Sequence, residues 1–163
     1  MKSNFICYFD EDGVLNLFEK DKNARKNMWI PGYFENIPIR EGICDVLRRI
    51  NKEAYVIVLT KVINRIGVTK EKSIWISKIP EDAYSDIIYV PYNQKKSDYI
   101  YPFYPSILVD DKEENLDDCS KKGCHGLFLS DLKVSQRYEN ARKVEDIWNF
   151  YQRVKKLYEE GPR

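Results

Sequence analysis

The sequence predicts an α/β fold, a Rossmann-like three-layer α/β/α sandwich around a central, mostly parallel five-stranded sheet. The main observation is an alternation along the chain. Short runs of consecutive apolar residues, typical of strands buried on both faces, alternate with segments of helical periodicity. A length of 163 residues suits one domain, and a hydrophobic share of 43% suits a globular core. No repeat or Gly/Ser-rich linker divides the chain, so residues 1–163 are predicted to form a single domain.

The predicted strands are short apolar runs that end at polar or turn residues. In chain order they cover residues 5–9, 55–59, 87–90, 107–109 and 126–129. The first run stops at Asp10, Asp12 and Gly13, which is the pattern of a buried strand that leads into a turn. The alternation of these runs with helical segments predicts that the strands are parallel.

The predicted helices carry apolar residues at helical spacing or end at residues that stop helices. They cover residues 40–53, 71–78, 95–101, 115–122 and 141–160. In the first of them Ile43, Val46, Leu47 and Ile50 share one face. Pro102 closes the third helix and Gly123 the fourth.

The composition argues against several classes of function. Lysine and arginine number 27 against 26 acidic residues, so the net charge of +1 argues against a protein that binds duplex DNA. A single histidine argues against a histidine-based metal site. The four cysteines lack metal-binding spacing, and no apolar run approaches about 18 residues. We therefore expect a cytoplasmic protein with free thiols, no signal peptide and no membrane partner.

Reactive side chains follow three of the predicted strands, at the edge where open α/β sheets bind ligands. Asp10-Glu11-Asp12 follows the first strand, Thr60 the second and Asp110-Asp111 the fourth. Lys95 and Lys96 open the helix before the fourth strand. Each residue by itself is a usual turn, cap or surface residue. Their gathering at one edge predicts a site.

Four segments resemble the motifs of the haloacid dehalogenase (HAD) superfamily. Residues 5–15, FICYFDEDGVL, are similar to its first motif, an apolar strand followed by DxDGxL. VIVLT (56–60) resembles the second motif and ILVDD (107–111) the fourth, and a lysine at 95 or 96 suits the third. The resemblance implies a HAD-like catalytic domain and a Mg²⁺-dependent phosphomonoester hydrolase that acts through an aspartyl-phosphate.

The resemblance also implies the roles of the acidic residues. Asp10 would be the nucleophile, and Asp12 the general acid and then the general base. An aspartate at position 12 favours phosphoryl transfer over carbon–halogen chemistry. Mg²⁺ would be held by Asp10, the backbone carbonyl of Asp12 and Asp110, with Asp111 as a supporting or alternative ligand.

The remaining motif residues would bind the phosphoryl group. Thr60 and a lysine are expected to contact its oxygens and to stabilise charge in the transition state. Lys96 is preferred for this role because a helix-opening position aims it back at the strand ends. Lys95 is the alternative.

Further segments resemble the 5'(3')-deoxyribonucleotidase-like branch of the superfamily. They are Pro31-Gly32-Tyr33-Phe34 before Pro38 and Glu41-Gly42, Glu71-Lys72 with Trp75 (EKxxW), and Asp110-Asp111 with Asn115-Leu116. This branch implies a small phosphorylated substrate, a (deoxy)nucleoside monophosphate. The alternatives are a phosphatase of another or larger substrate (a polynucleotide end, a phosphoprotein or a sugar phosphate) and a catalytically silent binding module.

Residues 13–38 are too few for a separate lid domain and are predicted to form a short flap, or minimal cap. An open site would admit a larger substrate, unless a second copy of the chain closes it as a homo-oligomer. The flap carries four aromatic residues that are candidates to stack on a base, with packing inside the flap as the alternative: Phe18, Trp29, Tyr33 and Phe34.

Overall fold

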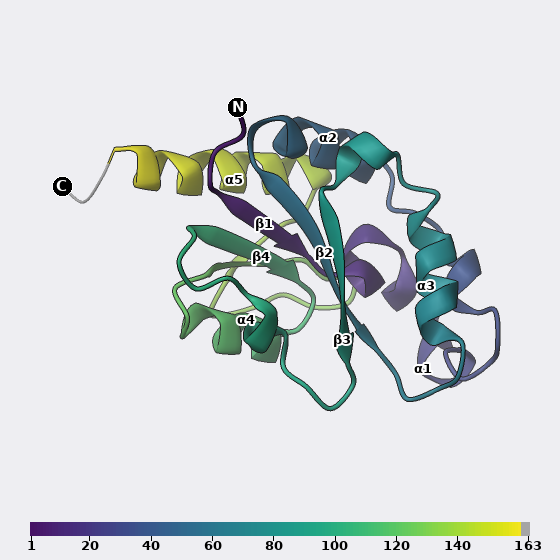
Figure 1. The fold of residues 1–163 in the computed structure, drawn as a ribbon. Helices are drawn as coiled ribbons and strands as arrows, with labels where there is room; N and C mark the ends of the chain where they lie inside the picture. Colours follow the sequence, from purple (N-terminus) through teal and green to yellow (C-terminus); the bar gives the residue numbers. More distant parts are fainter. Residues whose placement is uncertain (161–163) are drawn as a thin grey trace.

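The structure is a computed structural model that describes residues 1–160. Within these residues, six strands form one sheet in the order β3-β2-β1-β4-β5-β6, and every neighbouring pair is parallel. Figure 1 labels β3, β2, β1 and β4. The strands are β1 (Ile6–Phe9), β2 (Tyr55–Val62), β3 (Asp86–Pro91), β4 (Ser106–Asp110), β5 (His125–Phe128) and β6 (Glu139–Asn140). The prediction of an α/β fold with a parallel sheet is therefore confirmed.

The prediction of five strands was wrong by one. β6 has two residues, and it pairs with β5 through Leu127 opposite Glu139 and Phe128 opposite Asn140. Both residues of β6 are polar and partly or fully exposed. A strand this short and polar has no apolar run, so the pattern that revealed the other strands is missing here.

The central strand shows why consecutive apolar residues predict a sheet that is covered on both faces. All four residues of β1 are buried. Cys7 and Phe9 point into one apolar core, whereas Ile6 and Tyr8 point into the other. Neighbouring side chains of a strand point to opposite faces, so an uninterrupted apolar run needs a core on each side.

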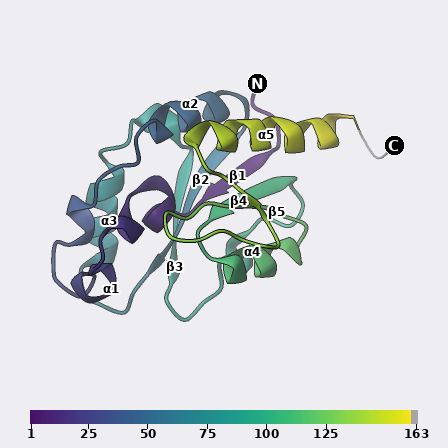
Figure 2. The ribbon, with the colours of Figure 1, turned by 180° about the vertical axis from the view of Figure 1, so that it is seen from behind.

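Within residues 1–160, four helices cover the two faces of the sheet: α2 (Ile43–Glu53), α3 (Val68–Ile76), α4 (Glu113–Ser120) and α5 (Val144–Glu159). A fifth, α1 (Ala24–Asn27), lies in the segment between β1 and α2. α2 and α5 lie side by side (Figure 2) and, together with α3, contribute to the larger core. α4 packs against β4 and β5 on the other face. This is the predicted three-layer arrangement. Among the described residues, no helix combines the length and the apolar character needed to span a bilayer.

Several bounds differ from the sequence prediction. α2 begins at Ile43 rather than at residue 40, because Gly42 adopts a left-handed φ of 76° at its start. The helix expected at 95–101 is only a 3-10 turn, Lys96–Tyr99. β2 continues to Val62, so Thr60 lies inside the strand rather than after it. α3, α4 and α5 are each shifted by one to three residues.

The flap, residues 13–38, lies beyond the carboxyl end of β1 and beside α3 (Figure 1). It contains α1, two short 3-10 turns (Phe18–Lys20 and Phe34–Asn36) and the end of the helical turn Glu11–Leu15, and no strand. Its two ends are held together by an antiparallel bridge between Asn16 and Ile39. Leu17 N donates to Pro38 O at 2.9 Å beside this bridge. The flap is therefore a closed loop with a narrow neck.

Candidate active site

Asp10 directly follows β1 and begins a tight loop. Its backbone N–H donates to Val109 O at 3.0 Å, which keeps it in line with β4. Gly13, three residues further on, has a φ of +82°. A Cβ at Gly13 would lie 2.7 Å from Asp111 Oδ2, closer than real Cβ contacts allow. The loop can therefore approach Asp111 only with glycine at this position.

Arg40 braces the same loop from the neck of the flap. Its Nε donates to Val14 O at 2.7 Å and its Nη2 donates to Gly13 O at 2.9 Å. The guanidinium also forms a two-pronged ion pair with Asp131, at 3.0 and 2.8 Å. This brace fixes the loop that carries the first motif.

Lys96 faces the acidic residues and Lys95 does not. Lys96 Nζ lies 2.7 Å from Asp10 Oδ1 and 2.6 Å from Asp110 Oδ2, and its side chain is 2% exposed. Burial alone would lower the pKa of Lys96, but the two carboxylates outweigh burial and raise it. Lys95 is 65% exposed and pairs with Asp118. The structure thus places Lys96, the preferred residue, in the site.

Asp110 is held in one orientation by several donors. Asn115 Nδ2 lies 3.1 Å from each of its carboxylate oxygens, and Lys112 N donates to Oδ1 at 2.9 Å. Asn115 was predicted only as part of a family-like stretch, not as a site residue. Its amide contributes a fixed polar contact at the floor of the site.

Asp10, Asp110 and Asp111 form a cluster that suits a metal ion. Each offers one oxygen, and these oxygens lie within 4.8 Å of one another. Within residues 1–160, Asp111 Oδ1 is buried without a hydrogen-bond partner. Burial and the charges of Asp10 and Asp110 raise the pKa of Asp111 well above its usual range. The ammonium of Lys96 faces Asp10 and Asp110, and the three carboxyl groups together form an all-oxygen donor set, which suits Mg²⁺.

Asp12 stands apart from this cluster. Its Oδ2 lies 2.5 Å from Lys72 Nζ, and its Oδ1 accepts from Asn16 Nδ2 at 3.0 Å. Lys72 is fully buried and also contacts Glu11, at 3.3 Å, and Thr60 Oγ1, at 3.0 Å. The side chain of Asp12 is therefore fixed outside the metal cluster. Metal binding by its backbone carbonyl stays a prediction.

Lys72 is the site residue that the sequence analysis missed. Burial would lower its pKa, but Asp12 and Glu11 outweigh burial and raise it. Burial also raises the pKa of Glu11 to about 8, although Lys72 acts in the opposite direction. The EKxxW pattern contained the available signal, but it was interpreted only as a mark of a family branch. The phosphate-binding role of Thr60, whose hydroxyl contacts Lys72, stays a prediction.

A cavity of about 590 Å³ opens over these residues. Asp10, Asp12, Asp111 and Lys96 all contribute to its lining. The cavity joins the carboxyl ends of β1 and β4 to the flap. It is the place where a ligand would meet the first, third and fourth motifs together.

The four aromatic residues of the flap separate into different environments. Phe18 and Phe34 line the active-site cavity, with parallel rings whose centroids lie 6.3 Å apart. Tyr33 packs edge-on against both rings and donates its hydroxyl to Asp21 at 2.7 Å. Trp29 is 53% exposed and lines neither this cavity nor the flap cavity described next.

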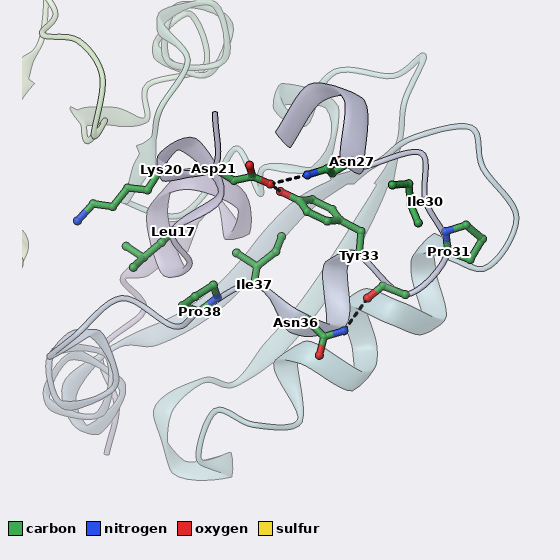
Figure 3. Close-up of a pocket in the computed structure, with 11 residues that line it drawn as sticks. Leu17, Lys20, Asp21, Asn27, Ile30, Pro31, Tyr33, Asn36, Ile37 and Pro38 are labelled. Atoms are coloured by element: carbon green, nitrogen blue, oxygen red, sulfur yellow. Dashed lines mark hydrogen bonds between the residues drawn. The ribbon is translucent and has the colours of Figure 1, made fainter. Parts of the chain in front are cut away.

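A second cavity, of about 640 Å³, lies within the flap (Figure 3). None of the predicted catalytic or metal-binding residues lines it. Asp21 lines both cavities and accepts hydrogen bonds from Tyr33 and Asn27. Although slightly larger, the flap cavity lacks the chemistry of the first one.

Comparison with known proteins supports the fold. Neither family models nor curated proteins match the sequence. Among solved structures, a haloacid dehalogenase-like hydrolase from Streptococcus pneumoniae has a TM-score of 0.66 at 12% identity, over 90% of this chain and 98% of that one. D,D-heptose 1,7-bisphosphate phosphatase from B. bronchiseptica, solved with magnesium and phosphate, has a TM-score of 0.63 at 13% identity, over 99% and 100%.

A dehalogenase is equally similar, with a TM-score of 0.66 at 9% identity, over 92% of this chain and 98% of that one. The chain therefore has the fold of HAD-like hydrolases. This fold includes more than one chemistry, so the reaction has to be argued from the site. None of these three structures is described as a nucleotidase, and the nucleotidase branch stays a prediction.

Proposed function

We propose that this protein is a Mg²⁺-dependent phosphomonoester hydrolase in which Asp10 forms an aspartyl-phosphate. The observation that carries the proposal concerns two carboxylates that are only two residues apart in the sequence. The structure holds them in different surroundings. Asp10 lies in the acidic cluster beside Lys96, whereas Asp12 is held outside it by Lys72 and Asn16. Two carboxylates in different surroundings can serve as nucleophile and as proton carrier.

In the first step a carboxylate oxygen of Asp10 attacks phosphorus, and the bond between phosphorus and the leaving oxygen breaks. Lys96 Nζ lies 2.7 Å from Asp10 Oδ1 and partly balances the negative charge that develops beside Asp10 in the transition state. Asp12, in its protonated form, gives its proton to the leaving oxygen. The alcohol departs, and the phosphoryl group stays on Asp10.

In the second step Asp12 acts as a base. Its carboxylate takes a proton from a water molecule whose oxygen attacks phosphorus, and the acyl-phosphate bond breaks. The Asp10 carboxylate is regenerated, and inorganic phosphate is released. Lys72 and Asn16 bind one carboxylate oxygen of Asp12 each. These two contacts fix the orientation of the Asp12 side chain in both proton-transfer steps.

Asp10, Asp110 and Asp111 would hold Mg²⁺, as the unpartnered oxygen of Asp111 and the all-oxygen donor set suggest. When bound, the ion offsets the repulsion between an anionic nucleophile and an anionic phosphate. The phosphatase from B. bronchiseptica, solved with magnesium and phosphate, supports this reading at the level of the shared fold.

The substrate we propose is a nucleotide, as the sequence resemblance to the 5'(3')-deoxyribonucleotidase-like branch implies. A cavity of about 590 Å³ falls within the usual size for small-molecule sites, roughly 300–1,000 Å³. Phe18, which is half-buried and packs against the buried ring of Phe34, supplies an aromatic surface on its wall. Such a surface suits a base placed beside the scissile phosphate.

The test is a phosphate-release screen with Mg²⁺ over nucleoside monophosphates, sugar phosphates and phospho-oligonucleotides. We expect release from at least one class, and its loss with chelator or with Asp10→Asn. Lys96→Met should lower the rate at least 100-fold, as loss of one stabilising donor does elsewhere. Lys95→Met is the matched control and should retain the wild-type rate.

Two outcomes would contradict the proposal. Metal binding without phosphate release from any substrate would instead favour a silent binding module of this fold. Halide release from haloacids, with no phosphatase activity, would favour carbon–halogen chemistry.

A further inference from the structure

Five basic side chains line the active-site cavity without an acidic partner among residues 1–160: Lys22, Arg25, Lys26, Lys61 and Lys112. Within the described part of the chain, no hydrogen bond or ion pair engages any of these side chains. Four of the five are exposed, and Lys61 is partly buried. We call this group the basic rim. In a chain with a net charge of +1, it is a local concentration of uncompensated positive charge.

The basic rim comes from three separate segments of the chain. Lys22, Arg25 and Lys26 belong to the flap around α1, Lys61 to β2, and Lys112 to the turn after β4. Basic residues that merely form the solvent-exposed face of a helix would all come from one element. Convergence of three segments on one cavity instead indicates a surface shaped for an anion.

The acidic residues of the cavity are engaged elsewhere. Glu19 Oε2 accepts from Ser130 Oγ at 2.6 Å and from Asp131 N at 2.9 Å. Asp21 accepts from Tyr33 and Asn27, and the other acids of the lining face Lys96, Lys72 or the metal cluster. These partners hold the acids in place, so none of them forms an ion pair with the basic rim.

The scissile phosphate does not need the basic rim. Lys96 already places positive charge beside Asp10, and Mg²⁺ held by the acidic cluster would add to it. A phosphomonoester carries a charge of about −2 at neutral pH. Five further cations exceed what one such group requires, and four of them reach into solvent rather than toward the buried floor.

We infer that the basic rim binds a second phosphate group of the substrate. This inference rests on the proposed function, because it takes the first phosphate to be bound at Asp10. The preferred substrate is then a phosphomonoester with a further phosphate, as in a nucleoside 3',5'-bisphosphate or at the phosphorylated end of single-stranded nucleic acid. Long, exposed side chains suit either source, so an experiment must distinguish them.

The experiment compares kcat/KM for three substrates that share one nucleoside. The first is the 5'- or the 3'-monophosphate, whichever is hydrolysed faster. It defines which phosphate of the nucleoside is cleaved. The other two are the 3',5'-bisphosphate and a single-stranded oligonucleotide phosphorylated at that same position. At low salt we expect a preference of about tenfold over the monophosphate, since each exposed ion pair contributes little by itself. The preference should shrink as salt screens the rim.

The two sources give different patterns. Equal preference for bisphosphate and oligonucleotide would show that one extra phosphate is sufficient. Preference for the oligonucleotide alone would assign the rim to a nucleic-acid backbone. Either pattern supports the inference, and equal kcat/KM for all three substrates would overturn it.

A charge-reversal variant tests the rim directly. Lys22→Glu, Arg25→Glu and Lys26→Glu together should bring the ratio of kcat/KM values close to one. The matched control combines Lys52→Glu, Lys121→Glu and Lys156→Glu, which are exposed and absent from the cavity lining. The control should keep the wild-type ratio. If the rim variant folds poorly, the test is the salt dependence of the preference measured on the wild type. A preference over the monophosphate that does not change with salt would then overturn the inference.

Binding separates failure of this inference from failure of the proposed function. If the wild type hydrolyses no phosphomonoester, the proposed function fails. Calorimetry with the nucleoside mono- and bisphosphates still tests the rim in that case. Tighter binding of the bisphosphate by about tenfold, lost in the rim variant, would support the inference. Equal affinities would reject it.

Discussion

At the scale of single residues, the site depends on how neighbouring carboxylates are kept apart. Asp10 and Asp12 are close in sequence, yet Lys96 holds one and Lys72 the other. Lys72 has no exposed surface. Its polar partners lie in the loop after β1 or in β2, and its Nζ also lies 4.6 Å from the ring centroid of Phe34 in the flap. We therefore expect Lys72 to position Asp12 rather than to contact the substrate.

Lys72→Met should therefore impair proton transfer more than binding. We expect kcat for an alkyl phosphomonoester to fall roughly 100-fold, the lower end of what general acid–base catalysis supplies. Hydrolysis of p-nitrophenyl phosphate should fall much less, because its leaving group needs no proton. Steady-state kinetics on both substrates, with circular dichroism to verify folding, checks this.

Lys70→Met is the control for that variant, since Lys70 is exposed on the same helix. It should leave both rates unchanged. Equal loss of the two activities in Lys72→Met would show that Lys72 supports the fold or the phosphate site rather than Asp12.

Gly13→Ala tests the close approach of the loop to Asp111. A left-handed φ costs a residue with a Cβ about 1–2 kcal/mol, and here the Cβ would also displace Asp111 Oδ2. We expect lower stability and weaker Mg²⁺ binding, measured by urea unfolding and calorimetry. Gly123→Ala is matched, with a φ of +81° and nothing within 4 Å of the added Cβ. It should lose similar stability and keep its metal affinity.

At the scale of elements, α3 links the flap to the site. Glu71 pairs with Arg65 at 2.7 and 2.8 Å, and Arg65 Nε donates to Met28 O in the flap. Trp75 Nε1 donates to Ile37 O at 2.6 Å. With Lys72 between them, the EKxxW pattern describes one stretch of helix that anchors both the flap and Asp12.

Glu71→Gln tests this anchor through its pH dependence. Hydrogen bonding to Arg65 holds the pKa of Glu71 below its ordinary value of 4.5. The ion pair therefore stabilises the fold above pH 4.5, and the contribution is lost as pH falls through the lowered pKa. Urea unfolding should show Glu71→Gln about 1–3 kcal/mol less stable at pH 7. The gap should narrow in acid, and a gap independent of pH would contradict the ion-pair explanation.

At the scale of the whole molecule, metal binding and folding should be coupled. Metal-free protein buries the Asp111 carboxyl with one oxygen unpartnered among the described residues. The raised pKa of Asp111 means that its carboxyl keeps a proton in the folded state. In the unfolded state the same carboxyl loses this proton above its ordinary pKa of 3.8. Stability of the metal-free protein is thus lost as pH rises from about 4 toward that raised pKa.

Asp111→Asn should then show opposite effects with and without Mg²⁺. In chelator at pH 8 the variant should have a higher Tm than the wild type, because the cost of burying the acid is gone. In excess Mg²⁺ the wild type should gain stability by ligand binding while the variant gains less. A variant that is less stable in both conditions would contradict this account.

Much of the fold was predictable because it follows from local pattern. The all-apolar β1 required a parallel sheet with two covered faces, and strand ends in such a sheet gather at one edge. β6 was missed because Glu139 and Asn140 have no apolar signal.

The choice between Lys95 and Lys96 depends on the orientation of one 3-10 turn, which periodicity alone does not determine. Lys72 was missed because its contact with Asp12 joins residues 60 positions apart.

The narrow neck of the flap has a consequence for how such a protein can change. Because the bridge between Asn16 and Ile39 closes the loop at its base, the length of chain beyond the bridge can change without a change in the distance between its two ends. Doubling the length of a closed loop costs only about 0.6 kcal/mol. Insertions, deletions or grafts beyond the neck can therefore alter which molecules enter while the reaction stays intact. Selection and engineering can treat the flap as an exchangeable part.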